Sequence, residues 1–535
     1  MMRKNNFLHL FVVIALIIIS CKSDDETIIS PQNQNPGNFS IEVSQVATNS
    51  WLLNWDDAID PDGDTVSYAI TLNGTEISSA ITDTEYLLEE LSPSTNYNGT
   101  VIASDGNNGT TQNTFTFTTT ETIGTMVGIA WEKSFGGSEI DIAYSIALTT
   151  DGGYAIAGGS NSDDGDVGGN NDADGFLGGD FWVIKLNGSG DLLWETNIGG
   201  SANDDVYSIQ QTSDGGYIAT GSSNSQTSID GSPSFFDFWV IKLDASGNVI
   251  WENNYGGSGN EGANSINETS DGGYIVAGFA GSSDGNVSGN NGMVDFWIIK
   301  IDSLGILEWE KNFGGSEFDI ANSIEQTNDG GYIVGGYTES FDGDVSNHYG
   351  DRDYWIIKLD ASGNLVWEKS LGGTLEDFAN DVRQTMDNGY IVAGFSESSD
   401  FDVSNNNGKK DMWIVKLNSS GEIVWETSLG SSESDSGQSI QQTTDQGYVV
   451  AGYSGASDGD VSTNNGGYRD YWIVKLSDLG ELSWEISVGG PEPDYANAIQ
   501  QTNDGYIVTG HVQGPGGDIS GSGKGKWDYW VVKLE

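Results

Sequence analysis

A glycine-rich turn followed by an apolar segment recurs through most of the chain, and this repeat limits the possible folds more than any other feature. One copy, at residues Asp271–Gly278, reads DGGYIVAG. The copies follow at steps of 63, 57 and then four times 58 residues, and the tyrosines that mark them are Tyr154, Tyr217, Tyr274, Tyr332, Tyr390, Tyr448 and Tyr506. Glycines before a β-branched run predict a tight hairpin. Seven similar units must therefore share one architecture.

Each unit contains four extended segments. In one middle unit they are Ala321–Thr327, Tyr332–Tyr337, Asp353–Leu359 and Leu365–Lys369, and a polar loop at residues 338–352 precedes the third. Short turns between such segments predict a four-stranded antiparallel meander. Four-stranded repeats at a spacing near 58 residues are typical of β-propeller blades.

The phase of the repeat indicates a closed ring. The array opens at Ile129–Glu132, which matches a fourth segment, and closes at Tyr529–Leu534, which matches a third. Pairing these two segments would complete the last blade and leave no exposed sheet edge. We therefore predict an all-β fold with a seven-bladed β-propeller over residues 128–535, closed by an N-terminal outer strand.

Two known repeats resemble these units. DGGYIVAG followed by DFWIIK, at Asp295–Lys300, resembles the delta-60 type of repeat of secreted and surface bacterial proteins. The segment Asp360–Trp367 is similar to the tryptophan-docking repeat of quinoprotein propellers. Both resemblances imply a propeller, and neither implies an activity. The second would allow a quinone cofactor, but the basic and cysteine residues that usually frame one have no counterparts here.

The N-terminus has the features of an export signal. Arg3 and Lys4 precede an apolar run at Phe7–Ile19, which is too short to span a bilayer as a helix. Cys21, the only cysteine, follows at once, so disulfides within the chain are excluded. Residues 1–20 resemble a bacterial lipoprotein signal, which implies lipidation of Cys21, and Lys22–Glu26 looks like the acidic export tag of Bacteroidota-type surface lipoproteins. We expect a lipid-anchored protein of the outer membrane, at the cell surface; an ordinary cleaved secretory signal is the alternative.

Two further segments lie between the signal and the array. Residues 21–38 are polar and predict a flexible tether. Residues 39–121 alternate short β-branched segments with turns, which predicts a small β-sandwich. This part resembles a fibronectin type III domain, with Trp55 as its core tryptophan and Leu91–Tyr97 as its tyrosine corner. Asp60–Asp64 predicts a turn more readily than a calcium loop, and residues 122–127 form a linker.

Large and charged residues repeat with the blades. Tryptophans in the third and fourth segments are expected to join neighbouring blades. Each third segment carries a lysine and each fourth a glutamate, and we expect these to pair across the strands. The lysines are Lys185, Lys242, Lys300, Lys358, Lys416, Lys475 and Lys533, and the glutamates are Glu132, Glu195, Glu252, Glu310, Glu368, Glu426 and Glu485.

A first candidate binding site is a ring of acids just before the innermost strands. Its members are Asp141, Asp204, Glu261, Asp319, Asp377, Asp435 and Asp494. Around a channel mouth they would attract cations or a basic group. The alternative is that each carboxylate accepts backbone N–H bonds in its own loop.

A second candidate is a set of loops with alternating Asp or Asn, which suit calcium. These residues are Asp164, Asp166, Asp284, Asn286, Asp342, Asp344, Asp400, Asp402, Asp458 and Asp460. The glutamate that ends an EF-hand loop is missing, and Asx turns are the alternative. Calcium is thus a possible ligand, and no other cofactor is predicted.

The net charge and the few histidines exclude some classes of function. A net charge of -59 repels phosphate backbones, so nucleic acid is not an expected partner. Outside the signal only His348 and His511 are histidines, and we predict no catalytic residue. We expect a surface binding or scaffold protein whose propeller loops contact an extracellular protein, a glycan or a cation. The alternatives are an extracellular polysaccharide-active hydrolase or lyase and a purely structural surface protein. Three segments that depart from the repeat are marked for a partner: Ser225–Phe236, Lys409–Lys410 and Pro515–Trp527.

Overall fold

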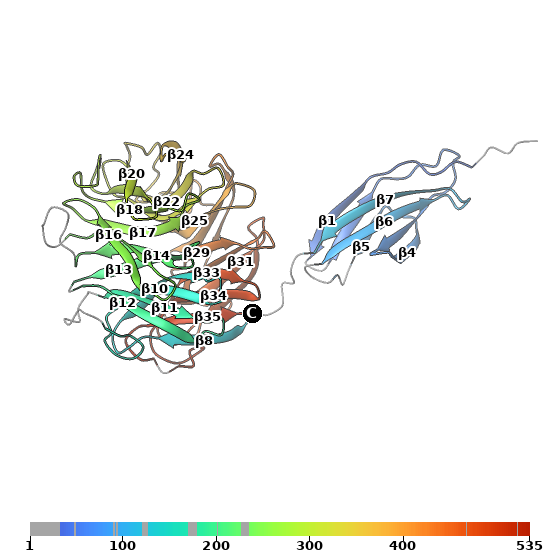
Figure 1. Ribbon diagram of the computed structural model, residues 1–535. Coiled ribbons are helices and arrows are strands. Elements are labelled where there is room, and N and C mark those ends of the chain that lie inside the picture. The colour runs from blue at the N-terminus through green and yellow to red at the C-terminus, as the bar shows by residue number, and fades with distance from the viewer. Residues whose placement is uncertain are drawn as a thin grey trace, which may run out of the picture. The chain divides into compact units, whose positions relative to one another are not determined.

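The computed structural model describes most of the chain beyond the N-terminus. The described residues are 33–47, 50–88, 91, 95–119, 127–169, 179–200, 202–225, 235–466, 468–521 and 523–535. Their regular secondary structure consists of β-strands, and within these ranges no helix is long and apolar enough to cross a membrane. The predicted signal, Cys21, most of the tether and most of the linker lie outside the described residues. The chain divides into two compact units, Met1–Thr122 and Ile123–Glu535 (Figure 1).

The first unit is a pair of antiparallel sheets, one ordered β1-β2-β5 and the other β4-β3-β6-β7. Its strands are β1 (Ile41–Ala47), β2 (Ser50–Trp55), β3 (Ser67–Leu72), β4 (Thr75–Ile81), β5 (Glu85–Leu88), β6 (Asn96–Ser104) and β7 (Thr110–Thr118). Alternate residues of both sheets face one shared core, in which Trp55 is buried and packs edge-on against Tyr68. Asp60 Oδ1 accepts the backbone N–H of Asp62 at 2.8 Å, so a local turn forms there.

In the described part of the second unit, seven antiparallel sheets have four strands each. The first strands are β9 (Asp141–Leu148), β13 (Asp204–Gln211), β17 (Glu261–Glu268), β21 (Asp319–Gln326), β25 (Asp377–Gln384), β29 (Ser436–Gln442) and β33 (Asp494–Thr502). The second strands are β10 (Tyr154–Ser160), β14 (Tyr217–Ser223), β18 (Tyr274–Ala280), β22 (Tyr332–Thr338), β26 (Tyr390–Ser396), β30 (Tyr448–Ser454) and β34 (Gly505–Val512).

The third and fourth strands complete each sheet. The third strands are β11 (Asp180–Leu186), β15 (Asp237–Leu243), β19 (Asp295–Ile301), β23 (Asp353–Leu359), β27 (Asp411–Leu417), β31 (Asp470–Leu476) and β35 (Asp528–Leu534). The fourth strands are β12 (Leu192–Ile198), β16 (Val249–Tyr255), β20 (Leu307–Phe313), β24 (Leu365–Leu371), β28 (Ile423–Leu429), β32 (Leu482–Val488) and β8 (Ile129–Phe135). As the phase of the repeat predicts, β8 pairs with β35 from the other end of the array (Figure 1).

The glycine pair of the repeat forms the turn between first and second strands. Gly330 has φ +82°, a backbone conformation that side chains rarely adopt. At Gly331 a Cβ atom would lie 2.2 Å from the carbonyl oxygen of Leu359 and 2.6 Å from Lys358 Nζ. The first glycine therefore makes the turn, and the second leaves room for a buried lysine.

Tryptophans hold neighbouring sheets together. Those of the third strands are at most 2% exposed. Those of the fourth strands pack on the leading tyrosine of the next sheet with ring centroids 5.6–6.2 Å apart, in the pairs Trp131–Tyr154, Trp194–Tyr217, Trp251–Tyr274, Trp309–Tyr332, Trp367–Tyr390, Trp425–Tyr448 and Trp484–Tyr506. The first of these pairs joins the sheet that contains β8 to the sheet that contains β10.

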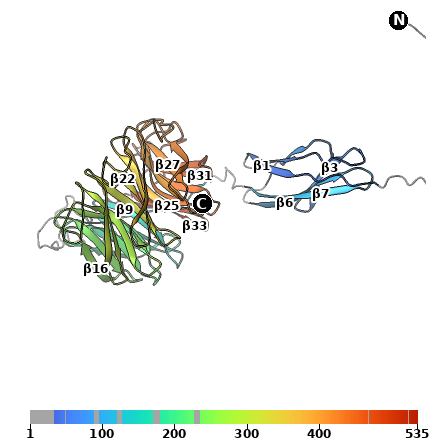
Figure 2. The same cartoon turned by 90° about the horizontal axis from the view of Figure 1, so that it is seen from above.

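Consecutive sheets also touch through their first strands. Each first strand contacts the first strand of the next sheet, and β33 contacts β9. The sheets follow one another in chain order in both views (Figures 1 and 2). The core of the second unit consequently lies between sheets, where the apolar faces of adjacent sheets meet.

The predicted pairing of lysine with glutamate is wrong. Lys358 lies opposite Trp367, and Glu368 lies opposite Ile357. Each lysine instead bonds to the aspartate of the glycine turn, as Lys358 Nζ does to Asp329 at 3.0 Å, and all seven sheets share this ion pair. Six of the glutamates accept the indole N–H of the third-strand tryptophan, as Glu368 does from Trp355 at 3.0 Å. The one-residue offset between the two strands decides these partners.

Candidate functional site

The seven predicted ring acids lie where the first strands begin. All are fully buried. In the sheet of β21, Asp319 Oδ2 accepts the backbone N–H of Gly315 and the hydroxyl of Ser340, both at 2.8 Å. The other six accept the equivalent backbone N–H, four residues earlier, at 2.6–2.8 Å. These carboxylates thus tie loops together and are closed to solvent, and cation binding by the ring stays a prediction.

Burial changes the acidity of this ring. It raises the pKa of Asp377 to about 6 and that of Asp494 to about 7, although hydrogen bonds to both side chains act in the opposite direction. Part of the ring is therefore costly to keep ionised near neutral pH.

The predicted calcium loops follow the second strands. Asp342 Oδ1 accepts the backbone N–H of Ser316 at 2.8 Å, and Asp344 Oδ2 accepts that of Gly314 at 3.2 Å. The same two bonds recur at the pairs Asp164 and Asp166, Asp284 and Asn286, Asp400 and Asp402, and Asp458 and Asp460. Among the described residues, no group of three or more His, Cys, Asp or Glu side chains is arranged to hold a metal ion. Calcium binding by these loops stays a prediction.

One position of the four-stranded sheets departs from the repeat: the residue just before each third strand. The residue before each third strand bonds through its carbonyl to the first backbone N–H of the next sheet, as Arg469 does to Asp494 at 2.7 Å. In three consecutive sheets this residue is a cation held over an aromatic ring. Arg352 lies 5.3 Å from the ring centroid of Tyr337, and Lys410 lies 4.0 Å from that of Phe395.

The third cation, Arg469, belongs to the densest group. Its guanidinium lies 4.6 Å from the ring centroid of Tyr453 and 5.3 Å from that of Tyr495, and it donates a 2.9 Å hydrogen bond to Tyr495 Oη. His511 stacks on Tyr495 at 5.0 Å, and Trp527 packs edge-on against His511 at 4.8 Å. We call Tyr453, Arg469, Tyr495, His511 and Trp527 the arginine–aromatic cluster. Its members are all half-buried, so part of each stays open to solvent.

The three cations differ in their counter-charges. Arg352 bonds to Glu339 at 2.7 Å and to Glu376 at 3.3 Å. Lys410 bonds to Glu376 at 3.1 Å and to Glu397 at 3.2 Å. Within the part of the chain that the structure describes, no carboxylate forms an ion pair with Arg469. Among the described lysines and arginines only Lys311 shares this lack of an ion pair, and no aromatic ring lies under its ammonium group.

His511 adds an uncharged group to the cluster. Burial lowers the pKa of His511 to about 3, so its ring is neutral at physiological pH. His511 Nδ1 lies 3.4 Å from Asn497 Nδ2, so this neutral imidazole offers a ligand its flat apolar face and its other ring nitrogen, Nε2. The cluster therefore combines one cation with rings that have polar edges.

The sequence found this cluster only in part. Of its members only Trp527 lies in a marked segment, Pro515–Trp527, whereas the marked Lys410 belongs to the separate pair with Phe395. Tyr453, Arg469, Tyr495 and His511 were missed because they belong to four different strands or loops of the sequence. The available signal was variation at the position before each third strand. The marked segment Ser225–Phe236 lies mostly outside the described residues.

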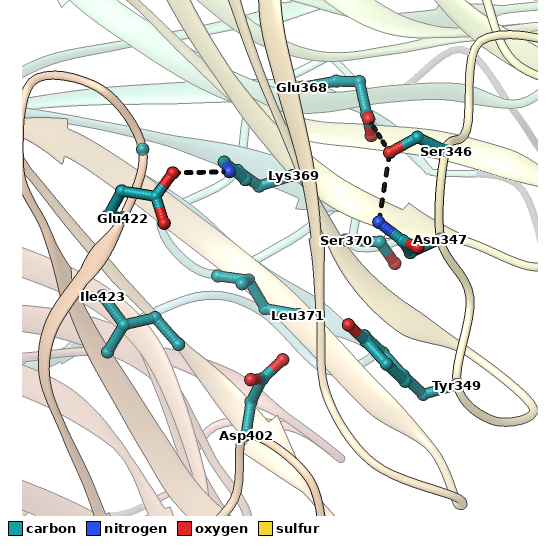
Figure 3. A pocket seen from close by; sticks show the side chains of 11 residues that line it. Ser346, Asn347, Tyr349, Glu368, Lys369, Ser370, Leu371, Asp402, Glu422 and Ile423 are labelled. Carbon is teal, nitrogen blue, oxygen red and sulfur yellow. Dashed lines mark hydrogen bonds and ion pairs between the residues drawn. The ribbon is translucent and has the colours of Figure 1, made fainter.

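A pocket of about 350 Å³ lies between the sheets of β24 and β28 (Figure 3). Tyr349, Leu371 and Asp402 line it, and Lys369 Nζ points to Glu422 Oε1 at 2.8 Å across its rim. The carboxylate of Glu422 thus neutralises Lys369, the lysine of this pocket. The pocket holds no histidine or cysteine, so it offers no imidazole base or thiol nucleophile.

Known proteins resemble separate parts of the chain. Residues 34–119 match the Fibronectin type III domain, which confirms the predicted family of the first unit. The regulatory protein FlaEY of Caulobacter vibrioides is 24% identical over 183 residues, which cover 32% of this chain and 19% of that protein. The chain thus spans about a fifth of the length of the curated relative it matches.

The structural neighbours are distant and β-rich. BBS1N, in its complex with ARL6DN, has a TM-score of 0.40 at 10% identity and covers 76% of this chain and 97% of its own. The extracellular domain of the hybrid two component system BT4673 from B. thetaiotaomicron has a TM-score of 0.39 at 12% identity and covers 93% and 53%. The exotype rhamnogalacturonan lyase YesX has a TM-score of 0.33 at 10% identity and covers 94% and 91%.

Proposed function

We propose that the seven sheets of the second unit close into a seven-bladed β-propeller. The contacts between the last sheet and the first repeat those between consecutive sheets: the backbone N–H of Asp141 donates to the carbonyl of Trp527 at 2.9 Å, and Trp131 packs on Tyr154. If the ring is closed, Trp131→Ala should lower the free energy of unfolding as much as Trp309→Ala, its equivalent inside the array. A much smaller loss for Trp131→Ala in urea denaturation would indicate an open array.

We also propose that the protein is a lipoprotein of the outer membrane, exposed at the cell surface. The support is the sequence at residues 1–26, where an apolar run ends at Ile19 and is followed by Ser20 and Cys21. Labelled palmitate should enter the wild-type protein and not Cys21→Ser. Protease added to intact cells should degrade the wild-type protein, and full protection would refute surface exposure.

For the propeller we propose glycan binding at the arginine–aromatic cluster, with a preference for sugars that carry carboxylates. The observation that carries this is Arg469, a half-buried guanidinium without a carboxylate partner among the described residues. It lies beside the rings of Tyr453 and Tyr495, which contact each other edge-on. A guanidinium binds a carboxylate through two parallel hydrogen bonds. Aromatic faces such as Trp527 supply the apolar platform on which a sugar ring can stack.

The net negative charge of the chain restricts where an acidic glycan can bind. A surface with so many carboxylates repels anionic polymers over long range. A negatively charged glycan can therefore bind only where a local cation is unpaired, and Arg352 and Lys410 are each neutralised by two glutamates. We expect that binding is weak at low ionic strength and strengthens as salt screens the repulsion.

The test compares polygalacturonate with neutral glucans by affinity electrophoresis. Arg469→Gln should weaken binding to the acidic polymer at least about tenfold, the effect of losing one charged hydrogen-bonding group. Lys409→Gln is the matched control, because Lys409 is an exposed cation paired with Glu433 and lies outside the cluster. Equal binding by Arg469→Gln and the wild-type protein would refute the proposal.

A polysaccharide lyase is the second candidate. Tyr495 Oη lies 2.9 Å from the guanidinium of Arg469, so one group could neutralise a uronate carboxylate while the other removes the proton on the adjacent carbon. The C–O bond to the neighbouring sugar, on the next carbon, would then break, and its oxygen would leave with the proton that was removed. The double bond that remains in the sugar would absorb ultraviolet light. Formation of this product by the wild-type protein and its loss in Tyr495→Phe would favour the enzyme over the binding module.

A further inference from the structure

Each junction between consecutive sheets contains two buried carboxylates that approach each other beside a glycine. At the junction of the sheets of β19 and β21, these are Asp295, which begins a third strand, and Asp319, which begins the next first strand. A Cβ atom added to Gly314 would lie 2.6 Å from both Asp295 Oδ1 and Asp319 Oδ2. The two oxygens therefore face one small space, which glycine leaves free of a side chain.

One of these oxygens has no hydrogen-bond donor. Asp295 Oδ2 accepts the backbone N–H of Asn291 at 2.6 Å, but its Oδ1 has no partner although the residue is fully buried. The same unpartnered Oδ1 occurs in Asp295, Asp353, Asp411, Asp470 and Asp528. A buried carboxylate oxygen without a donor is costly, because it has lost its water and gained nothing in return. Its repetition in five sheets argues for a common ligand.

Most of the charged groups around this space are carboxylates. Burial, followed by the nearby charges of Asp319 and Asp344, raises the pKa of Asp295 to about 7. Among the described residues, none of the five third-strand aspartates forms an ion pair with a lysine, an arginine or a histidine. Lys524, which lies near Asp528, is bonded to Asp166 instead. The charge of Lys524 acts to lower the pKa of Asp528, and that of His348 acts to lower the pKa of Asp319, but burial outweighs both. The space is thus lined by oxygen atoms, and among the described residues no cation forms an ion pair with them.

We propose that calcium ions bind at these junctions, one between each pair of carboxylates, and link neighbouring sheets. The pairs are Asp295 with Asp319, Asp353 with Asp377, Asp411 with Asp435, Asp470 with Asp494, and Asp528 with Asp141. Carboxylate oxygens are the ligands that calcium prefers, and its coordination geometry is flexible. The same glycine geometry joins Asp180 to Asp204 and Asp237 to Glu261, so the chain has room for two more ions.

These sites differ from both predictions made from the sequence. The ring acids supply only half of each site, and Asp342 and the other loop residues are bonded to backbone N–H groups. With two carboxylates at a site, we expect half-saturation at about 0.1–1 mM calcium, the range of extracellular calcium modules. The inference is independent of glycan binding, because the arginine–aromatic cluster contributes no residue to these pairs.

The test measures bound calcium and thermal unfolding of the purified protein after treatment with a chelator. Equilibrium dialysis should find five to seven calcium ions per chain, and 5 mM calcium should raise Tm by about 5 °C or more. Less than one ion per chain would overturn the proposal. An equal rise in Tm with sodium chloride of the same ionic strength would also overturn it, because that result indicates charge screening alone.

Substitutions at single junctions test where the calcium ions bind. Asp353→Asn and Asp411→Asn should each reduce the stoichiometry by about one ion, and the double variant by about two. Asp351→Asn is the matched control, since this exposed carboxylate lies two residues before Asp353 and is absent from every pair. Unchanged stoichiometry in the folded double variant would place the calcium elsewhere and refute the assignment. If the variants fail to fold, the stoichiometry of the wild-type protein still decides.

Discussion

The third strand of each sheet carries a buried charge near both ends, and the two ends are stabilised in different ways. In β23 the end at Lys358 is neutralised within the sheet, because Asp329 of the glycine turn lies 3.0 Å away. The end at Asp353 faces a second carboxylate, Asp377, of the next sheet. One end is therefore complete within a sheet, whereas the other depends on how two sheets meet and on what lies between them.

This difference shows which interactions a repeat can supply by itself. An ion pair between a strand and its own hairpin is copied with each unit, so all seven sheets have it. A site between sheets is also copied, but it forms only when neighbouring sheets dock. We expect the lysine end to resist removal of calcium and the aspartate end to respond to it.

The largest expected effect is acid unfolding from the lysine end. Burial alone would raise the pKa of Asp329, but hydrogen bonds from Thr327 and Gly331 and the charge of Lys358 outweigh it and lower the pKa to about 2. The pKa values of four equivalent aspartates also fall to about 2: Asp151, Asp214, Asp271 and Asp387. These pKa values lie below the value of about 3.9 that an aspartate has in the unfolded chain. The ionised aspartates therefore stabilise the folded state fully above about pH 4, and this stabilisation is lost as the pH falls to about 2.

Urea denaturation at pH 5, 4, 3 and 2 checks this effect. The midpoint should fall steeply between pH 4 and pH 2, with all five ion pairs lost together. A midpoint that stays constant over this interval would show that the lysine end does not depend on charge.

The next prediction compares substitutions of the two partners in one ion pair. Lys416 is 3% exposed, and its Nζ lies 2.9 Å from Asp387 Oδ2, whereas the Asp387 side chain is 64% exposed. Asp387→Asn keeps the turn but leaves a buried ammonium without countercharge, which should lower the free energy of unfolding by about 3 kcal/mol. Lys416→Met leaves a solvated carboxylate and should cost about 1 kcal/mol. The reverse order in equilibrium unfolding would contradict the account.

At the aspartate end of the third strand, a substitution should raise the free energy of unfolding instead of lowering it when calcium is absent. Asp353→Asn removes one of two buried like charges and keeps the shape of the side chain. Without calcium at pH 8 it should raise the free energy of unfolding by about 1 kcal/mol. With calcium the variant should be less stable than the wild-type protein. Destabilisation of equal size with and without calcium would indicate a structural role of Asp353 alone.

The smallest effect is expected just outside the junction. Asp351→Asn changes an exposed carboxylate two residues before Asp353 and should alter the free energy of unfolding by less than about 0.5 kcal/mol. A larger change, measured under the same calcium-free conditions, would show that the junction responds to net charge in general and not to the facing pair.

Much of the fold can be predicted from the sequence because the pattern within a sheet is local. The step of about 58 residues, the glycine turns and the alternation of segments give the strands of a unit and their order. The match of Ile129–Glu132 to a fourth segment predicts that β8 joins β35, which the structure confirms. The pairing of Lys358 could not be derived from residue types, because a shift of one position between strands exchanges aspartate for glutamate as its partner.

The sequence by itself determined the strands, the repeats, the acidic character and the fibronectin type III family of the first unit. Only the tertiary structure decided which groups meet between sheets: Asp295 with Asp319 beside Gly314, and Arg469 with Tyr495 and His511. The physical reason is that hydrogen-bonded ladders follow from spacing along the chain, whereas contacts between sheets depend on the twist and separation of whole layers. Those quantities result from the packing of all the tryptophans and tyrosines together, and no single motif encodes them.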